Sequence, residues 1–169
     1  MNQFIEQPAQ PDRSELDDFW RAAKQEVTKI KLGNEYQVRW IGLNDETTKQ
    51  ILGLIQTGDK TGTFTLPWIV ARTDQAPPKS GDAIILVDFD GKPKQLVRLT
   101  VIEEVPFGKI TSEHTAIDGT PVRGLDVWKP LHTQFWNHML EPFDLNVCDD
   151  MPVLIEKFEL LYSESQPTS

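Results

Sequence analysis

A short stretch of the chain gathers a glycine, a lysine and several threonines that together could bind an anion or activate a hydroxyl group. The stretch reads Gly58-Asp59-Lys60-Thr61-Gly62-Thr63-Phe64-Thr65. A lysine ammonium is a point charge that suits a phosphate. A threonine hydroxyl becomes a nucleophile when a neighbouring base removes its proton. Lys60, Thr61 and Thr63 are therefore candidates for anion binding or for nucleophilic chemistry.

The same residues also have a purely structural interpretation. Gly58 stands where a helix is expected to end, because glycine adopts the left-handed conformation there without a Cβ penalty. A lysine just past the end of a helix is favoured by the helix dipole. Regular strand alternation places Lys60 and Thr63 on opposite faces. The two side chains meet only if Lys60 lies in the turn or if Gly62 marks a bulge, and both interpretations stay open at this point.

The stretch resembles the G-x-K-x-x-T signature of the ASCH domain family, whose members are relatives of the PUA-like RNA-binding barrels. The resemblance continues in order and spacing over roughly residues 15–162. It is carried by Trp68, Pro78-Lys79-Ser80-Gly81-Asp82, Val105-Pro106-Phe107, Asp118-Gly119, Leu125-x-x-Trp128-x-x-x-His132-x-x-Phe135 and Asp150-Met151-Pro152-Val153. The chain is identified as a member of this family. The resemblance implies an α+β fold in which a PUA-like mixed or antiparallel β-barrel is flanked by helices, with a cleft beside the motif.

Members of the family have been linked to RNA binding, to RNA cleavage and to hydrolysis of acylated cytidine. In the hydrolase branch the lysine and threonine of the motif act with a glutamate from a later loop, which here implies Lys60 and Thr63. Many relatives have Glu-Gly-Glu-Gly-Asp in that loop, where this chain has Asp118-Gly119-Thr120-Pro121-Val122. The second acid is absent and the first is one methylene shorter. We therefore expect binding of RNA, or of a modified or unmodified nucleotide or nucleoside. The alternative is an amidohydrolase acting on N4-acylated cytidine, or a ribonuclease, with Lys60, Thr63 and Asp118 as catalytic residues.

The resemblance implies further candidate ligand-binding residues outside the motif. Arg123 would add a second positive charge, so we expect a local positive patch at Lys60 and Arg123. Trp128 and His132 could stack on a base or hydrogen-bond to it, as in readers of single-stranded RNA; a buried core position is the alternative for each aromatic side chain. The predicted ligand-binding residues are Gly58, Lys60, Thr61, Thr63, Trp68, Arg123, Trp128 and His132.

Composition limits the classes of partner. The chain has 169 residues and a net charge of -9, from 26 acidic and 17 basic residues. Such a charge repels a polyphosphate backbone, which disfavours extended non-specific binding of nucleic acid. The single cysteine, Cys148, excludes an internal disulfide, and the three histidines lack the spacing of zinc ligands. No apolar run approaches the roughly 20 residues that span a bilayer, and the N-terminus has no features of a secretory signal. We expect a cytoplasmic protein without metal or cofactor, whose partner is RNA or a nucleoside-sized ligand and not a membrane.

The elements that position these residues follow from periodicity and from turn signals. We predict one domain over residues 14–162, preceded by a flexible arm at 1–13 and followed by a tail at 163–169. Within it we expect a helix from Ser14 to near Gly33, a helix over Asn44–Thr57, an extended segment over Thr61–Val70, strands over Ala83–Phe89 and Lys94–Val105, a helix from Lys129 to Leu140 and a strand over Val153–Tyr162.

Overall fold

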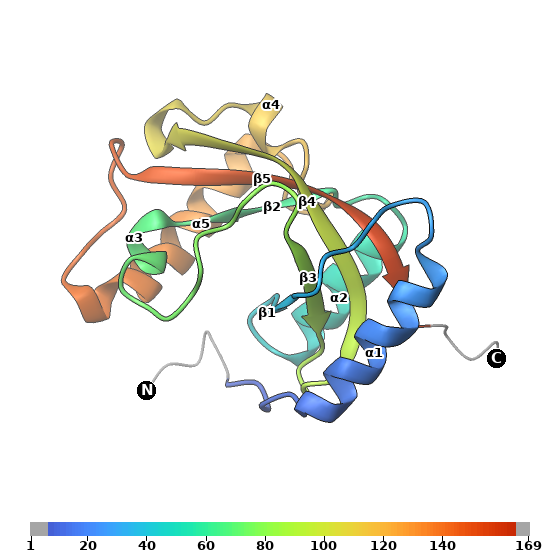
Figure 1. The fold of residues 1–169 in the computed structure, drawn as a ribbon. Coiled ribbons are helices and arrows are strands. Elements are labelled where there is room, and N and C mark those ends of the chain that lie inside the picture. Colours follow the sequence, from blue (N-terminus) through green and yellow to red (C-terminus); the bar gives the residue numbers. More distant parts are fainter. Residues whose placement is uncertain (1–6, 165–169) are drawn as a thin grey trace. The chain divides into compact units, whose positions relative to one another are not determined.

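Five strands form one mixed sheet, and helices lie before the first strand and between the strands along the chain (Figure 1). The computed structural model describes residues 7–164, so the first six residues of the predicted arm and the last five of the tail lie outside the described residues. The strands are β1 Gln37–Trp40, β2 Gly62–Thr65, β3 Ala83–Val87, β4 Pro93–Pro106 and β5 Pro152–Ser163. The helices are α1 Arg13–Glu26, α2 Asp45–Gln56, α3 Pro67–Val70, α4 Ser112–Thr115 and α5 Leu125–Leu140, with short 3-10 turns η1 at Phe107–Lys109 and η2 at Glu141–Phe143.

The strands are hydrogen-bonded in the order β1-β3-β4-β5-β2. The β1–β3 pair is parallel, and the β3–β4 and β2–β5 pairs are antiparallel. The predicted α+β class with a mixed sheet is therefore confirmed. The described chain divides into two compact units, one of residues 7–58, 81–99 and 159–164 and the other of residues 59–80 and 100–158.

The first unit is built on the apolar face of α1. Four buried side chains at helical spacing on α1 pack with side chains of β3 and with Leu96 of β4. The four are Leu16, Phe19, Trp20 and Ala23. The predicted helix is confirmed, but its predicted ends are not. Asp12 caps the helix by accepting a hydrogen bond of 3.0 Å from the backbone N–H of Ser14. Because Asp12 caps the helix in place of Ser14, the helix starts at Arg13. It ends at Glu26, well before Gly33.

α2 delivers the chain to the candidate site. The side chain of Asn44 accepts from the backbone of Thr47 at 2.8 Å, and the Thr47 hydroxyl accepts from the backbone of Asn44 at 3.0 Å. This reciprocal cap fixes the start of the helix. At the other end Gly58 has a φ of +82° and donates from its N–H to the Ile55 carbonyl at 3.1 Å. Both predicted boundary residues are confirmed.

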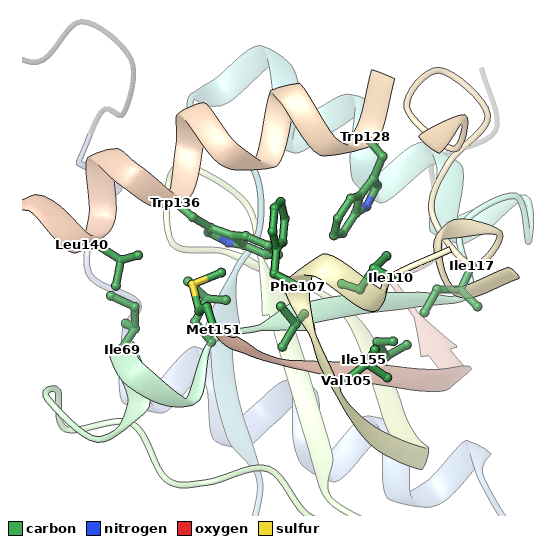
Figure 2. Packing of buried hydrophobic residues seen from close by; sticks show 12 residues of the cluster. Ile69, Val105, Phe107, Ile110, Ile117, Trp128, Trp136, Leu140, Met151 and Ile155 are labelled. Atoms are coloured by element: carbon green, nitrogen blue, oxygen red, sulfur yellow. The ribbon is translucent and has the colours of Figure 1, made fainter. Parts of the chain in front are cut away.

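The second unit has its own core, into which α5 inserts two tryptophans. Figure 2 shows Trp128 and Trp136 reaching from α5 toward Phe107, which lies in η1. The buried members of the cluster are Leu66, Ile69, Val105, Phe107, Ile110, Ile117, Trp128, Trp136, Leu140, Met151, Val153 and Ile155. All the residues of the site described below, apart from Gly58, belong to this unit.

Two predicted elements of this unit are corrected by the structure. The segment after Thr65 is not extended, because residues 67–70 form the helical turn α3; a proline fits its first position, where an N–H would have no partner. α5 starts at Leu125 and not at Lys129, with Pro130 inside it. The N–H of Trp128 already donates to the Gly124 carbonyl at 2.7 Å, so the helix is established before the proline.

Candidate functional site

A buried ion pair joins the motif to the loop that follows α4. The Lys60 ammonium lies 2.8 Å from Oδ1 of Asp118. The two residues are only 5% and 6% exposed. A single buried charge costs several kcal/mol of desolvation, which a partner in good geometry offsets. The structure thus brings together Lys60 and Asp118, which only the family resemblance had related, and each buried charge is partnered by the other.

The Asp118 carboxylate is held by two further donors. Its Oδ1 accepts from the backbone of Gly119 at 2.8 Å, and its Oδ2 accepts from the indole Nε1–H of Trp128 at 3.2 Å. The loop is also bound to the motif through the backbone, because the N–H of Thr61 donates to the Ile117 carbonyl at 2.9 Å. Three donors, counting the ammonium, converge on one carboxylate and fix its position. We call the side chains of Lys60, Asp118 and Trp128 the buried triad.

A second contact between motif and loop involves Asp59, which the sequence analysis did not single out. Its carboxylate accepts from the backbone and hydroxyl of Thr120 at 2.8 and 2.6 Å and from Arg123 Nη2 at 3.0 Å. The hydroxyl and backbone bonds from Thr120, together with the guanidinium of Arg123, hold the pKa of Asp59 below its usual value. Arg123 also donates from Nε to the Asp118 carbonyl at 3.0 Å. The only signal for Asp59 in the sequence was an acid at a variable position of the motif.

The ion pairs correct the expected positive patch. Lys60 lies against Asp118 at 2.8 Å and Arg123 lies against Asp59 at 3.0 Å. Each cation is therefore matched by a carboxylate, and the prediction of a positive patch at Lys60 and Arg123 is wrong. The four side chains of these two ion pairs together carry no net charge.

Aromatic rings pack around the triad from α5 and β2. The ring of Trp128 has no exposed surface, and the edge of Phe64 meets it at 4.7 Å between centroids. His132, one turn further along α5, stacks on Trp128 with centroids 4.1 Å apart and an angle of 21°. Trp128 cannot stack on a base in this structure; it supports Asp118. His132 is partly exposed, and its ligand-binding role stays a prediction.

The hydrogen bond of His132 to the backbone fixes its tautomer. Its Nδ1 lies 2.9 Å from the carbonyl oxygen of Trp128, and because a carbonyl only accepts, Nδ1 carries the hydrogen. The Nε2 of the neutral ring is then an acceptor. Burial lowers the pKa of His132; the bond to the Trp128 carbonyl and the charge of Asp118 oppose the shift, and the charge of Lys60 adds to it. At neutral pH the ring is therefore uncharged.

The lowered pKa of His132 predicts a pH-dependent loss of stability. The unfolded chain, with an ordinary histidine pKa of about 6.5, binds a proton at a pH where the folded chain does not. The stabilising effect is fully present above that value and is lost as pH falls from it toward the folded pKa. We expect the free energy of unfolding, measured by urea denaturation from pH 7.5 to 5, to fall more steeply in the parent than in His132→Phe. His138→Phe is the control, and identical slopes for parent and His132→Phe would refute the expectation.

Thr63 faces a different set of groups from Lys60. In the β2–β5 ladder Phe64 is opposite Ile155 of the core, and Thr63 is opposite Glu156. Alternation places Thr63 and its neighbours two residues away on the face that carries Glu156. Among the described residues, no hydrogen bond joins the Thr63 hydroxyl to Lys60. A lysine-activated threonine is not assembled in this structure, and the role of Thr63 stays a prediction.

Glu156 is a second acid that the sequence analysis missed. Its side chain is fully buried, and the hydroxyl of Thr65 donates to its Oε2. The only available signal was a lone acid on a strand face that Leu154 and Phe158 share by alternation. Glu156 lies directly across from Thr63 in the β2–β5 ladder, so the two residues are neighbours on the same face of the sheet.

Gly62 is required by a close approach and not by a bulge. The register of β2 with β5 is continuous from Gly62 to Thr65, so the bulge considered for Gly62 is absent. A Cβ at this position would lie 2.5 Å from the carbonyl oxygen of Glu156 and 2.4 Å from Cδ1 of Ile117. Only glycine lets the motif lie this close to both β5 and the loop.

The remaining predicted residues lie at the margins of the triad. Thr61 is exposed. Trp68 lies in α3 and is partly buried against the core of the second unit. Their ligand-binding roles, like that of Gly58, stay predictions.

No group of three or more His, Cys, Asp or Glu side chains within residues 7–164 could hold a metal ion. None of the helices in this part of the chain is both long and apolar enough to cross a bilayer.

Comparison with known proteins gives consistent findings. A family model described as the ASCH domain matches residues 38–162. The crystal structure of an ASCH domain from Lactobacillus crispatus JV V101 superposes with a TM-score of 0.77 at 17% identity, covering 95% of this chain and 98% of that one. A protein from Enterococcus faecalis V583, assigned to family DUF984, gives a TM-score of 0.75 at 23% identity, with 87% and 88% covered. At these identities the likeness shows the fold. No curated protein sequence matches the chain significantly.

Proposed function

This chain belongs to the ASCH domain family, and from that premise we propose that it binds RNA, or a modified or unmodified nucleoside or nucleotide, beside the Gly58–Thr65 segment. The family is one associated with RNA binding. The observation that carries the proposal is the 2.8 Å contact between Lys60 and Asp118 in a buried setting. Buried charges in a fixed geometry are groups that stability alone rarely selects.

The same contact favours binding over base catalysis. The Lys60 ammonium donates to the Asp118 carboxylate at 2.8 Å, and an ammonium has no lone pair with which to take a proton from Thr63. An amidohydrolase or a ribonuclease built on Lys60, Thr63 and Asp118 would need the pair to open and Thr63 to approach. Hydrolysis is therefore an outcome to be tested and is not our conclusion.

The pairing of both cations also predicts the character of the ligand. With Lys60 and Arg123 each matched by a carboxylate, few phosphates can be neutralised, and most contacts are made to the base and the sugar. The cytoplasmic location expected from the sequence stays a prediction.

The experiment is a titration with short single-stranded RNA and with nucleosides at several salt concentrations, run beside a turnover assay on N4-acetylcytidine. We expect binding of RNA whose logarithmic salt dependence is no steeper than about -2, because each phosphate contact on a single strand contributes roughly -0.7. A much steeper slope would mean that an extended basic surface binds RNA instead. If the parent releases acetate or cleaves the RNA, and a variant without Lys60 does not, the protein is a hydrolase and the binding proposal is wrong.

A further inference from the structure

His132 places an uncommitted hydrogen-bond acceptor beside the buried triad. The Nδ1–H of His132 donates to the carbonyl oxygen of Trp128 at 2.9 Å, and Nε2 has no hydrogen-bond partner among residues 7–164. The ring face is held on Trp128 at 4.1 Å, and Trp136 meets it at 4.9 Å with an angle of 62°. The direction in which Nε2 points is therefore set by packing on both sides.

We infer that His132 is a specificity-determining residue, whose Nε2 accepts a hydrogen bond from an N–H group on the edge of the bound nucleobase. The inference rests on the proposed function, because it assigns the base contact of that same site. An acceptor selects a donor on the ligand, such as the exocyclic amino group of adenine or cytosine or the ring N–H of uracil. A base that lacks the donor leaves Nε2 desolvated and without a partner.

The neighbours of His132 keep this acceptor available at neutral pH. The charged groups that act on the ring are Asp118, which favours its protonation, and Lys60, which opposes it. The other side chains in ring contact with it are aromatic, from β2 and α5: Phe64, Trp128 and Trp136. In acid the ring binds a second proton, both nitrogens become donors, and the preference for a donor on the ligand disappears.

The test compares each nucleobase with an analogue from which the donor hydrogen has been removed. Adenosine is paired with purine riboside, cytidine with its analogue lacking the 4-amino group, and uridine with 3-methyluridine, each as the nucleoside and as a homohexamer. We expect the tightest-binding member to lose roughly tenfold in affinity when its donor is removed at pH 7.5. His132→Phe, which retains an aromatic ring, should abolish this discrimination, and His132→Gln, which retains an acceptor, should preserve it. Only the parent should lose the discrimination as pH is lowered.

The possible failures are distinguishable. If no member of any pair binds, the proposed function and this inference fall together. If the ligands bind but donor and donor-free forms have equal affinity, or if His132→Phe still discriminates between them, only the inference is overturned. Circular dichroism of both variants at each pH establishes that folded protein is compared.

Discussion

Replacement of Lys60 by alanine is expected to lower the free energy of unfolding by about 3–5 kcal/mol, because it leaves a buried carboxylate without its counter-charge. Asp118 is 6% exposed and would keep only the donors from Gly119 and Trp128. From the sequence alone, a lysine that complements a helix dipole would have cost only about 0.3–1 kcal/mol. Urea denaturation of parent and variant at pH 7 measures the difference.

The matched control is another ion pair of the same length. Lys92 lies 2.8 Å from Glu15, but the two side chains are 53% and 39% exposed. Exposed pairs contribute little, since water screens the charges and the side chains lose entropy. Lys92→Ala should therefore leave stability nearly unchanged. Equal effects of Lys60→Ala and Lys92→Ala would show that burial of the Lys60 pair has no energetic consequence.

Trp128→Ala is expected to destabilise the protein by about 3–5 kcal/mol, the usual cost of truncating a large buried aromatic side chain. Trp128 has no exposed surface, and its Nε1–H is also the donor to Asp118 at 3.2 Å. Trp128→Phe separates the two contributions, because it keeps most of the packing and leaves one carboxylate oxygen without its donor, at about 1–3 kcal/mol. Unfolding free energies of the two variants are compared.

Trp40 provides the control for this series. It lies in β1 and is 39% exposed, so Trp40→Ala removes a side chain that is only partly buried and should destabilise the protein clearly less than Trp128→Ala. If Trp128→Ala were no more destabilising than Trp40→Ala, Trp128 would not have the supporting role that its burial indicates.

Local signals in the sequence predicted the elements that carry the site. The Asn44 cap and the left-handed Gly58 were predicted because each depends on a few adjacent residues. Periodicity likewise indicated the buried face of α1. Where tertiary context decides, prediction failed: residues 67–70 turn into a helix, and α5 continues through Pro130.

The site itself depended on contacts between distant residues. Lys60 and Asp118 are 58 positions apart, and only the family resemblance related them. No periodicity indicates that Asp59 pairs with Arg123, 64 positions away, or that Trp128 is fully enclosed. These contacts form only when the motif, the loop and α5 pack together, so the charge balance of the site could not be deduced from residue types.

The most direct test of the central claim removes both charges of the buried pair and measures ligand binding. Lys60→Met with Asp118→Asn should stay folded, because neither charge of the buried pair is left without its partner. One of the two donors that Asp118 accepts from, the Gly119 N–H or the Trp128 Nε1–H, then faces the Asn amide group, which costs about 1–3 kcal/mol. Lys92→Met with Glu15→Gln removes an exposed pair of the same 2.8 Å length and is the control. For the RNA or nucleoside that binds the parent, we predict that the Lys60/Asp118 double variant stays folded and loses binding by at least about tenfold, as expected for loss of a charged hydrogen-bonding group, while the control binds like the parent. A folded Lys60/Asp118 double variant with parental affinity would contradict the assignment of this pair to the ligand site.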